Sequence, residues 1–184
     1  MTNADTGSER ALGRLTAHLL RDVRRPRILV GGLGMGFTLR ALLDRLPRHA
    51  RVVVAELLPA VARWNRGRLG HLSGHPMNDG RVELRIGDVA RLLRGRPAWH
   101  AIVLDVDNGP EWLVQRRNGA LYQEGGLVRL VESLFPGGFL VLWSAERHPR
   151  FEQRLSSLGL RSRRFRDSPA AGPILYVVSS RPRT

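Results

Sequence analysis

The chain has 184 residues, a net charge of +14 and no cysteine, which excludes disulfides, thiolate zinc sites and cysteine nucleophiles. Hydrophobic residues make up 42% and charged residues 25%, as in an ordinary globular domain, and one domain of this size buries about 70% of its unfolded surface. No apolar run reaches the roughly 18 residues of a membrane helix, and the first residues lack a signal peptide's apolar core. We therefore expect a cytoplasmic protein with no membrane partner.

The positive charge comes from arginine alone, because the sequence contains no lysine. A field of this sign attracts anions, including nucleic acid. Two dense clusters stand out, one at residues 24–27 and one at residues 161–166. The other arginines are spread from Arg10 to Arg183. Because of this spread, we expect a solvated basic surface in preference to a nucleic-acid partner.

The first predicted element is a helix within an N-terminal helical segment, residues 1–26, that precedes a single domain over residues 27–184. It begins near Thr6, because Thr6 and Glu9 have the spacing of a capping box, and it ends at Pro26. The next helices are predicted at 36–46, at 59–69, after 88, at 119–134 and at 149–158. Trp64, in the helix at 59–69, is expected in the core. Strands are predicted at 27–30, 51–55, 82–86, 101–105, 139–143, 161–166 and 174–178.

This alternation of strands and helices predicts right-handed βαβ units and a mainly parallel sheet. Continuously apolar strands such as VVVA are typical of strands covered on both faces. The last two strands have only a turn between them and should pair as an antiparallel hairpin. Residues 70–80 are expected to form a loop. His71 and His75 lie in this loop beside Gly74 and Pro76, so we predict no metal site.

A glycine-rich turn, GGLGMG at residues 31–36, follows the first strand. In this fold, ligands bind outside the carboxyl ends of the strands, where glycines let backbone N–H groups approach them. A dinucleotide fingerprint would need its third glycine at Phe37, and a Walker loop would need lysine. Gly31, Gly32, Gly34 and Gly36 are therefore candidate cofactor-binding residues, and the alternative is a simple tight turn.

Acidic residues follow the next two strands. Glu56 lies 20 residues after Gly36 and can accept hydrogen bonds from both hydroxyls of a ribose, or it can cap the next helix. Asp88 either reaches an adenine amino group, directly or through the neighbouring amide, or caps the short helix after it. Leu57, beside Glu56, and Val89, beside Asp88, are assigned to the same cofactor site.

The fourth strand ends in DVDNGP, residues 105–110, where the transferred group of a cofactor would emerge. Asp105, Asp107 and Asn108 are the candidate catalytic residues, and Asp105 is also a candidate cofactor contact. The alternative is that these residues only form a turn, since these residue types favour turns. Trp112 and Tyr122 either wall the substrate pocket or pack in the core.

Four segments together resemble a known family: RILVGGLGMGFTLRALL, VVVAELLPAVARWNR, GDV and VLDVDNGPE. They are similar to the spermidine synthase-like branch of the S-adenosylmethionine-dependent methyltransferase superfamily, over about residues 27–143. The resemblance implies a Rossmann-like class I methyltransferase fold, an α/β fold with a mainly parallel seven-stranded sheet ending in an antiparallel hairpin and helices on both faces. It also implies cofactor or substrate roles for Gly32, Gly34, Glu56, Asp88 and Asp105.

Three departures from the family bear on the reaction. Aminopropyl-transferring members usually carry GGGDGG, and Gly34 stands where that aspartate would be. They also carry Asp-x-x-Asp at the fourth strand, and Asn108 holds the second position. In place of their N-terminal β-domain, only 26 residues precede the first strand. A site for polyamines and decarboxylated S-adenosylmethionine needs carboxylates to balance buried ammonium groups, so these losses favour the ordinary cofactor, whose own carboxylate the glycine turn and nearby arginines could hold.

The sequence thus predicts an S-adenosylmethionine-dependent transferase, first of all a methyltransferase acting on a small molecule. Asp105 would orient or deprotonate the acceptor, and Asn108 would hold it. The runner-up is aminopropyl transfer from decarboxylated S-adenosylmethionine to putrescine, with Asp105 or Asp107 as the base, and transfer of the aminocarboxypropyl arm is a related option. A further alternative is a non-catalytic cofactor- or RNA-binding module. Without the β-domain that builds the usual tetramer, a homodimer is the assembly considered.

Overall fold

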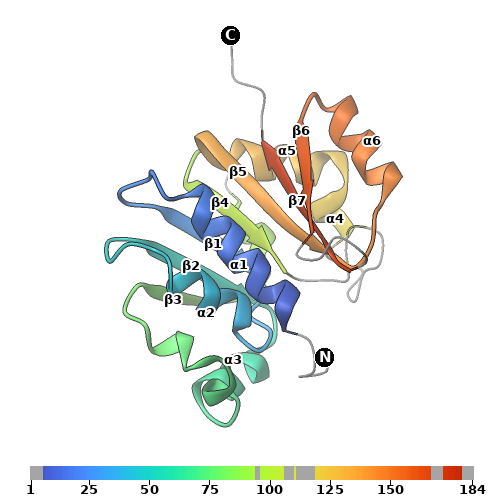
Figure 1. Cartoon of the computed structure of the whole chain (residues 1–184). Coiled ribbons are helices and arrows are strands. Elements are labelled where there is room, and N and C mark those ends of the chain that lie inside the picture. The colour runs from blue at the N-terminus through green and yellow to red at the C-terminus, as the bar shows by residue number, and fades with distance from the viewer. Residues whose placement is uncertain (1–5, 94–95, 106–109, 111–118, 167–171, 180–184) are drawn as a thin grey trace.

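Seven strands form one sheet in the order β3-β2-β1-β4-β5-β7-β6 in the computed structural model, which describes residues 6–93, 96–105, 110, 119–166 and 172–179 (Figure 1). Strands β1 to β5 are parallel, and β7 runs antiparallel to both β5 and β6. This arrangement confirms the predicted fold class, including the terminal hairpin. The strands are β1 (Arg27–Gly31), β2 (Arg51–Glu56), β3 (Val82–Ile86), β4 (Trp99–Leu104), β5 (Leu134–Ser144), β6 (Arg161–Phe165) and β7 (Ile174–Ser179).

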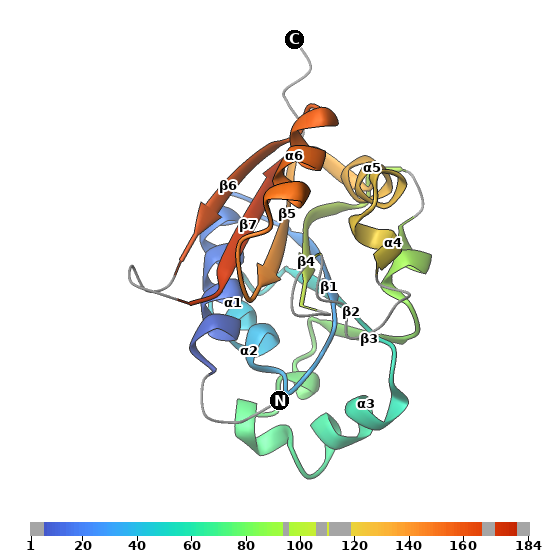
Figure 2. The same cartoon turned by 90° about the vertical axis from the view of Figure 1, so that its right-hand side faces the viewer.

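Helices cover both faces of the sheet (Figure 2). One face carries α1 (Gly7–Leu19), α2 (Phe37–Leu43) and α3 (Pro59–Arg66), and the other carries α4 (Gly119–Tyr122), α5 (Glu124–Glu132) and α6 (Pro149–Ser157). Three short 3₁₀ helices complete the elements: η1 (Gly70–Ser73), η2 (Pro76–Asn78) and η3 (Val89–Leu92). None of the helices in the described ranges is long and apolar enough to cross a membrane.

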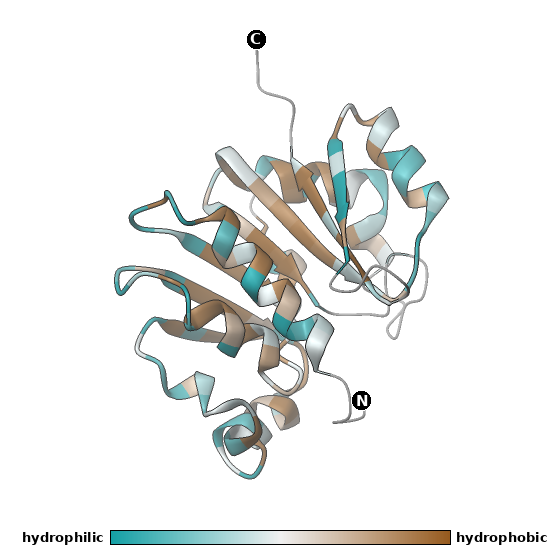
Figure 3. Ribbon diagram, in the orientation of Figure 1, coloured by the Kyte–Doolittle hydropathy of each residue, from teal (hydrophilic) through white to brown (hydrophobic). Residues whose placement is uncertain are grey.

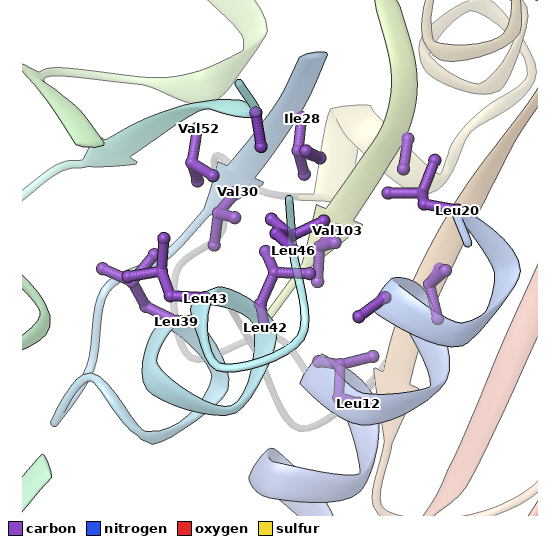
Figure 4. Packing of buried hydrophobic residues seen from close by; sticks show 14 of the residues in the cluster. Leu12, Leu20, Ile28, Val30, Leu39, Leu42, Leu43, Leu46, Val52 and Val103 are labelled. Atoms are coloured by element: carbon purple, nitrogen blue, oxygen red, sulfur yellow. The ribbon is translucent and has the colours of Figure 1, made fainter. Parts of the chain in front are cut away.

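The core has two halves, one on each side of the sheet. Val30, Val52 and Val103 of the strands pack against α1 and α2, whose contributions include Leu12 and Leu42 (Figure 4). The alternate strand residues, among them Leu29, Ile102 and Leu140, pack against α4, α5 and α6. Because successive side chains of a strand point to opposite faces, strands buried on both faces must be continuously apolar. The segments ILV, VVVA and AIVL meet that requirement.

The N-terminal helix differs from the prediction at both ends. Thr6 is its N-cap, but the side chain makes no capping hydrogen bond, and Thr6 Oγ1 instead accepts one from Arg10 Nε at 3.2 Å. The helix also ends at Leu19, well before Pro26, because the charged run after Leu20 offers little apolar surface to the core beyond Val23.

Three further predictions along the chain need correction. The helix expected over 119–134 is two helices, broken at Gln123, whose ψ of 164° is extended. The strand expected from Phe139 begins at Leu134, with a register irregularity opposite Trp99 and Ala101. Trp64 was expected in the core but is 52% exposed, because α3 turns Asn65, 1% exposed, towards the protein instead.

An ion pair anchors α2 to the start of β3. Arg81 pairs with Asp79, with Arg81 Nη2 2.7 Å from Asp79 Oδ2. The same guanidinium donates hydrogen bonds to the carbonyls of Leu43 and Leu46, at 2.9 and 2.8 Å, which the end of α2 leaves unpaired. The Arg81 partner lowers the pKa of Asp79 from 3.8 to about 2. Because α2 starts at the glycine turn, this anchor also fixes that turn from the far end of the helix.

Asp79→Asn should destabilise the fold at neutral pH by about 1–2 kcal/mol, a figure that allows for solvent screening of the pair. A carboxyl with a lowered pKa stabilises the folded state above its ordinary pKa of 3.8, and this contribution disappears as the pH falls towards 2. Urea unfolding of both proteins across this range measures the effect. The difference should vanish at the acid end, and a constant difference at all pH values would contradict the assignment.

Candidate functional site

The glycine turn lies at the carboxyl end of β1 and has an unusual backbone. Gly32, Gly34 and Gly36 have φ values of +87°, +52° and +84°, in the left-handed region that glycine adopts without strain. A side chain at Gly36 would also collide with its surroundings, since a Cβ there would lie 2.8 Å from Ser73 Oγ and 2.9 Å from Asn65 Oδ1. Glycine at these positions is therefore a requirement of the turn's shape.

Asn65 supports this turn, and the sequence interpretation did not identify it. Its Nδ2 donates to the carbonyl of Gly34 at 2.8 Å and to the carbonyl of Val61, one turn back in α3, at 3.0 Å. The sequence signal for Asn65 is a polar residue at a helical position that faces the core. The sequence pattern instead favoured Trp64, the residue before it, as the core residue. Asn65 holds the turn from the α3 side before any ligand is present.

Glu56 connects the turns that follow β1 and β2. It is 7% exposed, and its two oxygens are held separately. Oε2 accepts from the N–H of Leu33 at 2.9 Å, and Oε1 accepts from the N–H of Leu58 at 2.8 Å. Leu58 is the N-cap residue of α3, so the helix-capping alternative holds in part. Each carboxylate oxygen retains a second lone pair, which leaves both able to accept another hydrogen bond.

The end of β3 stands beside Glu56, since Glu56 and Ile86 are paired in register. Asp88 follows two residues later and caps η3, because its Oδ1 accepts from the N–H of Ala90 at 2.8 Å. Val89 is 4% exposed, and its side chain packs over Gly31. Leu57 is half-buried. Two large apolar side chains at this edge remain half exposed, Leu58 at 49% and Ile86 at 51%.

Asp105 lies at the carboxyl end of β4, with its N–H donating to the carbonyl of Gly31 at 2.9 Å. Its Oδ2 is 2.7 Å from the hydroxyl of Thr38, which also lies 3.1 Å from the carbonyl of Glu9 in α1. Burial raises the pKa of Asp105 above 3.8, and the hydrogen bond from Thr38 offsets part of this rise. Thr38 is a site residue that the sequence analysis missed, because its partners lie 67 and 29 residues away.

The first turn of α1 reaches the same edge. Its Arg10 guanidinium lies 5.0 Å from the ring centroid of Phe37, the residue directly after the glycine turn. The segment before β1 thus packs on the sheet and brings a cation to the glycine turn. Nothing in the local sequence around Arg10 marks it for this position.

Of the four remaining candidates, one lies in the core and three lie outside the described residues. Tyr122 is 2% exposed and packs edge-to-face on Phe151, with ring centroids 6.2 Å apart, which places it in the core. Asp107, Asn108 and Trp112 lie outside the described residues.

The fold is similar to solved structures of methyltransferases and of a spermidine synthase. Human methyltransferase-like protein 13, in complex with SAH, matches with a TM-score of 0.66 at 20% identity, over 95% of this chain and 80% of that one. Spermidine synthase from Thermotoga maritima matches with 0.68 at 19% identity, over 94% and 60%. The O-methyltransferase TomG from Streptomyces achromogenes, in complex with SAM, matches with 0.61 at 18% identity, over 92% and 80%.

These similarities confirm the Rossmann-like fold of methyltransferase type. The chain spans about four fifths of the two methyltransferases but only 60% of the spermidine synthase. No protein-family model matches the sequence, and a search of curated proteins gave no significant match.

Asp105→Asn should stabilise the folded protein at neutral pH. Because burial favours the protonated carboxyl, the folded chain binds more protons than the unfolded chain above pH 3.8, so the native free energy of unfolding falls as the pH rises. The amide of the variant does not titrate, so the variant does not lose stability in this way. Its free energy of unfolding should exceed that of the native protein, and this difference should shrink as the pH approaches 3.8. Urea unfolding at several pH values measures it. The exposed Asp22→Asn variant is the control, and an equal effect there would contradict the prediction.

Proposed function

We propose that this protein is an S-adenosylmethionine-dependent transferase, and that it transfers the methyl group to a small-molecule acceptor. The observation that carries the proposal is Glu56, whose buried carboxylate is fixed by two amides with one lone pair left on each oxygen. Two adjacent ribose hydroxyls present two donors at matching spacing, so the carboxylate suits a nucleoside. The methyltransferase-type fold around it supports the same conclusion.

The neighbouring residues fit the rest of the cofactor. The N–H groups of Gly34 and Met35 donate no hydrogen bond to another described residue, so they can donate to a carboxylate of the cofactor. Arg10 adds a positive charge over the ring of Phe37, the residue that follows this turn. Leu58 and Ile86 provide exposed apolar surface for an adenine ring, with Asp88 close by for its amino group. Gly31, Gly32, Leu57 and Val89 then shape the floor of the site.

S-adenosylmethionine supplies a methyl group that is already electrophilic, so the protein's contribution is to position the nucleophile in line with it. Asp105 stands at the carboxyl end of β4, next to the glycine turn, and its raised pKa brings it closer to the range of a general base. Thr38 orients one carboxyl oxygen through its hydroxyl and leaves the other to the acceptor. Asn108 and Asp107, which follow Asp105 closely in the sequence, remain proposed acceptor contacts, and Trp112 remains a proposed residue of the substrate pocket.

Aminopropyl transfer from decarboxylated S-adenosylmethionine is the second candidate, because spermidine synthases are among the similar structures. The acid typical of that reaction is replaced by Gly34, whose φ of +52° suits glycine and whose carbonyl is already engaged by Asn65. Arg10 would also lie near the ammonium end of the donor. Both features favour the cofactor that keeps its carboxylate, and hence the methyl-transfer proposal, over a polyamine acceptor.

Calorimetric titration with the two cofactors tests the proposed donor. We expect S-adenosylmethionine to bind at least tenfold more tightly than its decarboxylated form, a difference of about 1.4 kcal/mol. Arg10→Ala should reduce this preference, because it removes the cation that would face the carboxylate, whereas Arg14→Ala one turn along α1 should preserve it. Preference for the decarboxylated cofactor would favour the spermidine synthase reaction, and binding of neither would favour the non-catalytic module.

Asp105→Asn also tests the proposed chemistry. With labelled S-adenosylmethionine and the small-molecule fraction of a cell extract, the native protein should release S-adenosylhomocysteine. The variant should bind the cofactor with unchanged affinity and lose at least a hundredfold in rate, the usual contribution of a positioned base. Full activity in the variant would remove Asp105 from the catalytic role. Spermidine formation from putrescine and the decarboxylated cofactor should be absent.

A further inference from the structure

The arginine-rich strand β6 has two chemically different faces. Arg161, Arg163 and Phe165 are paired in register with Ser179, Val177 and Leu175 of β7. Leu175 and Val177 belong to the half of the core under α1, so these three β6 residues point to the α1 side of the sheet. On the opposite face, Arg164 forms an ion pair with Glu152 of α6. Among the residues that the structure describes, an acid balances the positive charge of β6 on this second face alone.

A cleft opens on the α1 side, where α1 stops short of the sheet edge. It has a volume of about 420 Å³ and lies between the end of α1, the start of β5 and the β6–β7 pair. Leu19, Val177 and Phe139 give it an apolar lining, and Arg161 and Arg163 line it from β6. All residues of β6 are exposed, Phe165 at 37%. Figure 3 shows the hydrophilic β6 next to the hydrophobic β7.

A second cleft of about 480 Å³ continues along α1 and shares Phe165 with the first. It adds four arginines from three different parts of the chain: Arg14, Arg21, Arg45 and Arg166. We call the two clefts together the basic groove. Among the described residues, no aspartate or glutamate lines either cleft, and Arg21 pairs at 3.4 Å with Asp22, which lies outside the lining. Within the described part of the chain, Arg45, Arg161 and Arg163 form no ion pair.

We propose that the basic groove binds a single-stranded nucleic acid. Six arginines along a groove with apolar patches match a strand that exposes both phosphates and bases. Phe165, where the two clefts meet, offers an exposed ring on which a base can stack. The scattered arginines of the sequence favoured a solvated basic surface over a nucleic-acid partner, and folding gathers six of them in one groove.

Other occupants fit the groove less well. A second copy of the chain would bring like charges together, which opposes a symmetric contact at this surface. Arginines on an edge strand also oppose the addition of a further uncharged strand. A duplex presents phosphates but hides its bases, so Leu19, Val177 and Phe165 would gain nothing from it. The single strand therefore uses both the charge and the apolar surface.

Fluorescence anisotropy with a labelled twenty-nucleotide oligothymidylate and with oligouridylate tests the proposal on the full chain. We expect both strands to bind alike, because the contacts are to phosphates and base faces, and a duplex of the same length to bind more weakly. Arg161→Ala with Arg163→Ala should weaken binding at least tenfold. The slope of log affinity against log salt should fall by about 1.4, since each lost phosphate contact accounts for about 0.7.

The matched control is Arg48→Ala with Arg51→Ala, which removes the same charge from exposed residues in a different cleft, at the amino-terminal end of β2, a strand separated from β5 by β1 and β4. It should change affinity less than threefold. Three outcomes would overturn the proposal: an equal loss of affinity in both double variants, a preference for the duplex, or no binding at all. The first two would indicate only a general attraction to the +14 charge.

Phe165→Leu separates stacking from charge. Leucine keeps the apolar packing against Leu175 but removes the ring, so the affinity should fall by about tenfold with an unchanged salt slope. Thermal unfolding of each variant shows whether the fold is intact. Cofactor titration of the same variants keeps this inference distinct from the proposed transferase activity, since none of the substituted residues lies at the glycine turn.

Discussion

Glu56 accepts a hydrogen bond from each of two loops, the glycine turn after β1 and the turn that leads into α3, and it thereby holds the ends of two neighbouring strands in one arrangement. A buried carboxylate is costly unless its oxygens are paired, and here the backbone amides of Leu33 and Leu58 pair them. The first of these two hydrogen bonds depends on glycine at 32, 34 and 36, because other residue types rarely adopt the left-handed backbone conformation that brings the N–H of Leu33 to Glu56. Asn65 completes the support from α3.

The acids Glu56 and Asp105 at this edge are held in different ways, and this difference suits them to different tasks. Glu56 accepts a hydrogen bond from a backbone amide on each oxygen, which fixes the position of both oxygens. Asp105 has a hydroxyl on one oxygen, and burial raises its pKa. A fixed acceptor and a carboxyl with a raised pKa, at the ends of the two strands that flank β1, are what a binding residue and a proton-transferring residue require.

Helix α1 connects the two surfaces to which functions are proposed. At its first turn, the carbonyl of Glu9 lies 3.1 Å from the hydroxyl of Thr38, and Arg10 lies over the ring of Phe37, the residue after the glycine turn. Further along, Arg14, Leu19 and Arg21 line the basic groove. The helix packs on α2 and β5 and shares the core of the sheet through Leu12 and Leu20. A change in its position would therefore act on both surfaces.

The amino-acid sequence by itself determined the seven strands, the hairpin, the glycine turn and the acids at the strand ends. These features are encoded locally, because hydrophobic periodicity and turn residues act over a few positions. The predictions that depended on distant contacts were less complete. Trp64 is exposed while Asn65 is buried, since only the packed sheet decides which side of α3 faces inward. Thr38 meets Asp105 across 67 residues, and the basic groove joins Arg14 to Arg161. Which side chains become neighbours across such separations is decided by the tertiary structure, because the sheet order and the register of its edge strand place them together.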